Sequence, residues 1–98
     1  MNTANLQLEG LYMALAAMNR LMVEKGLVSH ADVEAALSQA IAGIDAGDRS
    51  ELSKSNRSSV AFPIRLLLLA NEAAEKGDRP DFKDYARRIG QQDMPQVE

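Results

Sequence analysis

The stretch LEGLYMALAAMNRLM, residues 8–22, carries large apolar side chains at intervals of three and four residues. This spacing keeps them on one side of an α-helix, as in the seam between two packed helices. The seam residues are Leu8, Leu11, Leu15, Met18 and Met22. Further apolar residues between them widen the surface, so the helix must bury much of its circumference. The sequence leaves open whether the seam packs against its own chain or against a second copy.

The composition predicts an all-α protein. The chain has 98 residues, 46% of them hydrophobic and 26% charged, which is typical of one soluble globular domain. It contains only four aromatic residues and no tryptophan. β-Branched and aromatic residues never alternate over the length of a strand. We therefore expect a single helical domain over residues 1–98, with a core of aliphatic residues, methionine and alanine.

Several classes of function are disfavoured by composition. The chain has no cysteine, which excludes disulfides, thiol catalysis and cysteine-based metal sites. No signal peptide is visible, and no apolar run approaches the length of a membrane span. The net charge of −3 gives no general attraction to nucleic acid or to anionic lipid. We expect a cytoplasmic protein that binds neither membranes nor nucleic acid.

Capping signals divide the first half of the chain into two helices. The first is expected over residues 5–25, followed by Gly26 in a left-handed conformation. Ser29 and Asp32 form a capping box that begins the second helix, which Gly47 ends. The short connection between the two helices predicts an antiparallel pair.

The second half predicts another helical hairpin after a polar, serine-rich loop at about 47–58. The third helix is expected to begin near Ser58 or Ser59 and to end at Gly77, with the turn of residues 66–69 as the most enclosed point. A short fourth helix should run from Asp81 to about residue 89, stopped by Gly90. The tail at about 91–98 is expected to be disordered. The predicted fold is a small bundle of four helices, built as two hairpins.

No grouping of residues predicts an enzyme, a cofactor or a metal site. His30 and Glu34 have the spacing of a metal-binding pair, but the chain has no other histidine and no cysteine to complete the site. We interpret His30 as an exposed residue of the first helical turn. Serines are numerous, yet no Gly-x-Ser-x-Gly motif is present. We therefore predict no catalytic residues.

An anion site at the start of the third helix is the best ligand hypothesis. Free N–H groups at a helix start favour phosphate or carboxylate, and two guanidinium groups could close over the anion. The residues involved are Arg57, Ser58, Ser59 and Arg65. In the alternative interpretation, the serines only cap the helix and the arginines are solvated or paired with carboxylates.

Two asparagines lie beside apolar stripes in the middle of predicted helices, where asparagine is intrinsically disfavoured. Asn19 and Asn71 could fix the register between helices, as semi-buried asparagines often do. The interpretation that we favour places both at the solvent-exposed edge of the stripe.

These observations favour a non-enzymatic interaction or assembly protein. The short fourth helix and the modest second helix offer too little apolar surface to cover the first helix. We expect a homodimer that forms through the seam, with another protein as a possible further partner. The alternative function is a regulatory domain that binds a small ligand or an anion at the third helix.

Overall fold

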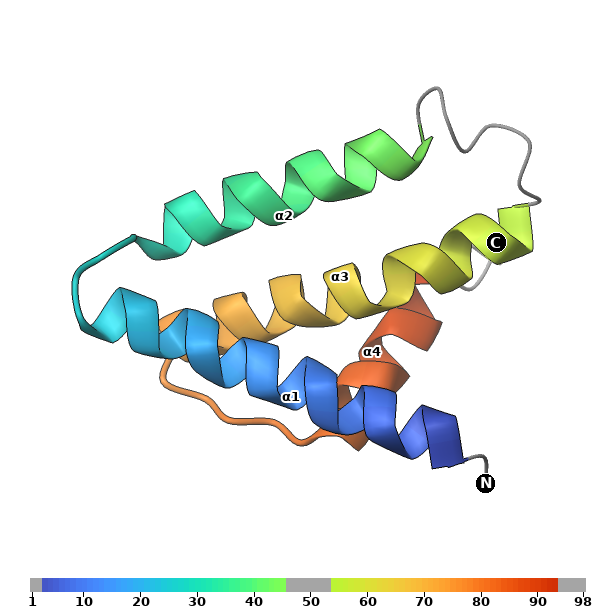
Figure 1. Ribbon diagram of the computed structural model, residues 1–98, viewed down its shortest axis with the longest axis horizontal. Helices are drawn as coiled ribbons and strands as arrows, with labels where there is room; N and C mark the ends of the chain where they lie inside the picture. The colour runs from blue at the N-terminus through green and yellow to red at the C-terminus, as the bar shows by residue number, and fades with distance from the viewer. Residues whose placement is uncertain (1–2, 46–53, 94–98) are drawn as a thin grey trace.

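The computed structural model describes residues 3–45 and 54–93, which form four α-helices and no strand. The helices are α1 (Thr3–Glu24), α2 (His30–Asp45), α3 (Lys54–Glu75) and α4 (Phe82–Asp93) (Figure 1). This confirms the predicted all-α class, the number of helices and the short last helix. None of these helices is both long enough and apolar enough to cross a membrane.

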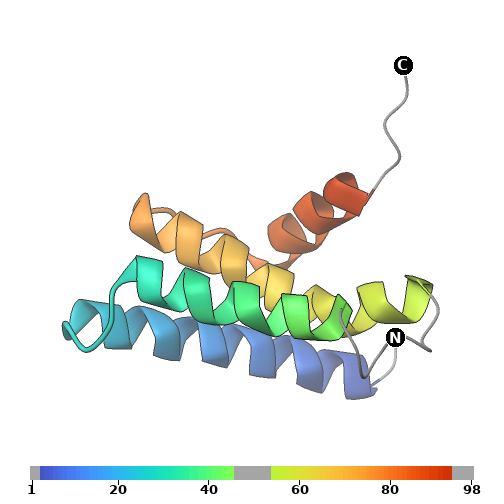
Figure 2. The ribbon, with the colours of Figure 1, turned by 90° about the horizontal axis from the view of Figure 1, so that it is seen from above.

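Helix α3 is the centre of the molecule, because each of the other helices has its closest packing against it. Helices α1 and α2 run in opposite directions and are joined at one end (Figure 1). Figure 2 shows α4 extending away from the other three helices, while its first residue, Phe82, lies against Tyr12 of α1. Each of α1 and α2 packs more closely on α3 than on the other. The predicted antiparallel direction of the first two helices is therefore confirmed, although both pack on α3 in preference to each other.

The core explains this arrangement. Helix α3 supplies half of the buried apolar residues among the described part of the chain. They are Ala61, Leu66, Leu67, Ala70 and Ala73. Leu66 is completely buried, Leu67 is buried, and the next two leucines are half-buried. The turn expected to be most enclosed thus contains the most buried leucine, and its apolar side chains attract neighbours from several directions.

Helix α4 closes the core with Tyr85 and Ile89, which are 4% and 2% exposed. Burial raises the pKa of the Tyr85 hydroxyl above its usual value of 10.0, because the charged phenolate is poorly solvated there. The positive charges of Arg88 and Arg20 oppose this rise. The phenol therefore joins the core in its neutral form.

The predicted helix ends are confirmed at both glycines with a left-handed backbone. Gly26 has a φ of 75° and Gly77 a φ of 82°. After the first, the Leu27 N–H donates to the carbonyl of Met22 at 3.0 Å. After the second, the Asp78 N–H makes the equivalent bond to Ala73 at 2.8 Å. The first bond pairs a carbonyl that the end of α1 would otherwise leave without a partner, and the second is added to the bond that the Ala73 carbonyl accepts from the Lys76 N–H.

The predicted capping box of α2 is also present, and α4 begins with a similar one. The Asp32 N–H donates to the hydroxyl of Ser29 at 3.0 Å, and the Ser29 N–H donates to the Asp32 carboxylate at 2.9 Å. At α4, the Asp84 N–H donates to the Asp81 carboxylate at 2.9 Å, and the reciprocal bond measures 3.4 Å. These side chains satisfy N–H groups that have no partner inside the helix, and they define where α2 and α4 begin.

Two helix boundaries differ from the prediction. Helix α3 begins at Lys54, so Ser58 and Ser59 lie in its second turn and do not cap it. Extension of a formed helix adds one hydrogen bond per residue, and the polar residues of this segment are tolerated in helices. Helix α4 continues through Gly90 to Asp93, since a single glycine costs a helix only about 1 kcal/mol. The expected helix end at Gly47, most of the loop and residues 94–98 of the tail lie outside the described residues.

Asn71 joins α3 to the beginning of α2. Its Nδ2 donates to the carbonyl of His30 at 2.9 Å, and its Oδ1 lies 2.8 Å from the His30 Nδ1. Because a carbonyl oxygen only accepts, Nδ1 carries the proton and donates it to Asn71. Both residues are half-buried. The interpretations of Asn71 as solvent-facing and of His30 as exposed are therefore wrong.

Candidate functional site

Helix α1 is thinly packed for its length of 22 residues. Ala16 is its only buried residue, and Tyr12 and Met13 pack partly against the core. These side chains define the inward face of the helix. The chain's own core buries little of the rest of α1. The face next to the inward one therefore has no covering within the core.

The predicted seam lies on that adjoining face and remains exposed. Leu8 and Leu15 are each 43% exposed, Leu11 is 53% exposed and Met18 is 56% exposed. Met22, at the end of the seam, is half-buried. The seam is therefore not intrachain core. Monomeric proteins rarely leave a row of large apolar side chains in water, and such a row typically marks an interaction surface.

The seam is also free of charge. At 3.6 residues per turn, the three charged residues of α1 fall on the opposite side of the helix from the seam's centre. They are Glu9, Arg20 and Glu24. Leu21, which is 45% exposed, and Ala14 flank the seam on one side, whereas the core-facing residues flank it on the other. A partner would therefore meet an apolar surface without desolvating any charged group of α1.

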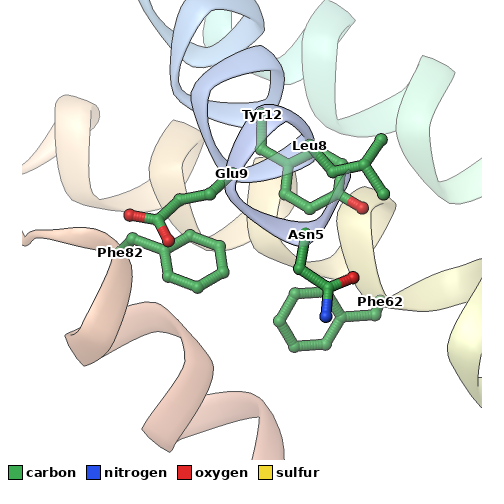
Figure 3. Close-up of a pocket in the computed structure, with 6 residues that line it drawn as sticks. All are labelled: Asn5, Leu8, Glu9, Tyr12, Phe62 and Phe82. Carbon is green, nitrogen blue, oxygen red and sulfur yellow. The ribbon is translucent and has the colours of Figure 1, made fainter. Parts of the chain in front are cut away.

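A hollow of about 330 Å³ adjoins the N-terminal half of the seam. Three rings converge on it from different helices, Tyr12 from α1, Phe62 from α3 and Phe82 from α4 (Figure 3). Their centroids are 6.2–6.3 Å apart in each pair. Asn5, Leu8 and Glu9 complete the lining, so Leu8 belongs to both the seam and the hollow.

No local pattern in the sequence predicts this hollow. Its three aromatic residues are separated by 50 and 20 positions, and no local spacing connects them. The only available signal was their scarcity, because three of the four aromatic residues of the chain meet here. Their meeting depends on how α1 and α4 pack against α3, which the sequence pattern does not specify.

The anion hypothesis loses its main physical support. Ser58 is the fifth residue of α3, so its N–H lies within the hydrogen-bonded part of the helix. Arg57 and Arg65 are two turns apart, about 12 Å along the axis. Arg65 lines a second hollow together with the carboxylates of Glu34 and Glu72, which oppose anion binding. The four-residue anion site stays a prediction, without the free helix N-terminus that motivated it.

The other polar clusters within the described part of the chain mix charges of both signs or lack the ligands of a metal site. Among residues 3–45 and 54–93, no three metal-binding side chains of histidine or acidic type lie close enough together to hold an ion. His30 lies at a small hollow with Arg20, Glu24, Asp78 and Arg79, where charges of both signs are mixed. On α4, the Arg87 guanidinium lies 3.4 Å from the Asp84 carboxylate.

Comparisons of the chain with protein-family models, with curated proteins and with solved structures found no match. A function for this protein must therefore be argued from the physical properties of its surfaces, of which the exposed seam of α1 is the most distinctive.

Proposed function

We propose that this protein is a non-enzymatic assembly protein that self-associates as a symmetric dimer through the seam of α1. The observation that carries the proposal is the exposure of Leu8, Leu11, Leu15 and Met18, each between 43% and 56%. Burial of apolar surface contributes about 25 cal/mol per Å², so covering this row supplies a substantial driving force for association.

A second copy is the occupant that best fits the seam. Its alternating spacing of three and four residues is the pattern that lets one helix interlock with a like helix. A two-fold axis places the same surface on both partners, so a surface that joins two copies must be complementary to itself. The seam does so, because the charged residues of α1 lie on the helix's other side and cannot face their own copies across the axis.

The test is the solution mass, measured by size-exclusion chromatography with light scattering over a range of concentrations. The wild-type chain should approach twice 10.7 kDa at high concentration. The double variant Leu15→Glu, Met18→Glu should remain at the monomer mass, because each partner would bury two uncompensated carboxylates. Far-UV circular dichroism should show unchanged helix content, since both positions are exposed in the monomer.

A matched control shows whether the loss of the dimer is specific to the seam or follows from placing a charge at any exposed apolar position. Val60 on α3 is 38% exposed and lies outside the seam, so Val60→Glu should leave the dimer intact. A wild-type chain that is monomeric at every concentration would refute the proposal. It would also be refuted by a dimer that survives both seam substitutions or is lost equally with Val60→Glu.

A further inference from the structure

The aromatic hollow combines two features that favour a positively charged ligand. The first is the set of rings of Tyr12, Phe62 and Phe82, which come from three helices. The Tyr12 and Phe82 rings are inclined by only 20°, whereas the Phe62 ring is tilted by more than 50° from both. The rings thus form a corner, and the negative face of an aromatic ring attracts cations.

The second feature is the carboxylate of Glu9. Glu9 is half-buried and lines the hollow, and Figure 3 shows its carboxylate beside the Phe82 ring. None of the six lining residues is basic, so no positive charge within the lining neutralises Glu9. A cation placed against the rings would therefore also be attracted by the Glu9 carboxylate.

We propose that this hollow, formed by α1, α3 and α4, binds a methylated or quaternary ammonium group. Such a group carries a positive charge within an apolar shell, so it suits aromatic walls with one carboxylate. A simple ammonium is more strongly hydrated, and a metal ion requires more oxygen ligands than Glu9 and Asn5 provide. The volume of about 330 Å³ lies at the lower end of small-molecule sites, consistent with a trimethylammonium group on a short chain.

The site is distinct from the proposed dimer, although Leu8 contributes to both. The experiment therefore uses the monomeric background Leu15→Glu, Met18→Glu alongside the wild-type chain. These two residues do not line the hollow, so the background retains the complete site. If the wild-type chain is already a monomer, the two substitutions are unnecessary and choline binding is measured on the wild-type chain alone. The ligand proposal can then fail or succeed whatever the oligomeric state.

The probe is choline, titrated by NMR, with 3,3-dimethyl-1-butanol as an uncharged molecule of the same shape. The N-methyl signal of choline should move upfield through the ring currents, and the ring signals of Phe62 and Phe82 should shift in a saturable manner. The uncharged isostere should bind about three- to thirtyfold more weakly, the range expected from loss of a cation–π attraction.

Two substitutions test the residues. Glu9→Gln removes the charge but keeps the shape, and Phe82→Leu removes a ring but keeps an apolar side chain; each should weaken choline binding severalfold. Glu24→Gln, an exposed change at the other end of α1, should leave choline binding unchanged. Equal binding of choline and its isostere would overturn the proposal. So would unaltered affinity in Glu9→Gln, or the absence of saturable shifts at high choline concentration.

Discussion

Asn71 shows how a single polar side chain connects distant parts of this fold. Its amide holds both the ring and the backbone carbonyl of His30, at 2.8 and 2.9 Å. Replacement by alanine removes both bonds and leaves the half-buried ring N–H of His30 without a partner. We expect Asn71→Ala to lower the free energy of unfolding by about 1–2 kcal/mol, measured by urea denaturation.

Asn19 provides the matched control for this substitution. It is also half-buried within a helix, but it makes no side-chain hydrogen bond with the described part of the chain. Alanine is the better helix former by a few tenths of a kcal/mol, so Asn19→Ala should leave stability unchanged or slightly raised. Equal losses in the two variants would show that the bonds to His30 contribute nothing specific. The sequence could not distinguish the two asparagines, because the partner of Asn71 lies 41 positions away.

At the scale of the element, glycine acts in opposite ways at a helix end and in a helix interior. Gly77 has a φ of 82° at the end of α3, whereas Gly43 lies in the regular part of α2. An added Cβ would meet no atom within 4 Å at either position, so only the backbone conformation differs. We expect Gly77→Ala to destabilise the protein by about 1–2 kcal/mol. Gly43→Ala should stabilise it by about 0.5–1 kcal/mol, measured by the same urea denaturation.

A stabilising effect of Gly77→Ala would contradict this assignment of the left-handed helix end.

The same local chemistry explains which helix boundaries the sequence could predict. The starts at Ser29 and Asp81 and the ends before Gly26 and Gly77 depend on residues within one turn, and all four were predicted. The start of α3 was not, because its polar first turns contain no comparably strong signal.

At the scale of the whole molecule, the sequence predicted the fold class, which follows from composition, better than it predicted how the helices pack on one another. Sparse aromatic and β-branched residues, together with helical spacing, were sufficient for the all-α class. The same spacing identified the seam of α1 but could not decide whether the chain's own helices cover it. That question depends on α3 taking the central position, which draws α2 away from α1. The aromatic hollow follows from the same arrangement and was equally beyond local patterns.

The central position of α3 has a consequence for unfolding. Because every other helix packs mainly on α3, loss of its contacts should unfold the molecule as one unit. Leu66→Ala empties a completely buried site and should cost about 2–5 kcal/mol. Leu68→Ala, two residues further along the same helix at a half-buried site, should cost only about 1 kcal/mol.

Urea transitions recorded at one fixed protein concentration, by far-UV circular dichroism and by tyrosine fluorescence, test both parts of this prediction. Helix content reports on all four helices, whereas Tyr12 and Tyr85 report on the contacts of α1 and α4 with α3. The two transitions should coincide in the wild-type chain and shift together to lower urea in Leu66→Ala. Separate transitions would mean that α1 or α4 leaves the core independently. Equal shifts for the two leucine variants would mean that Leu66 is not the centre of the packing.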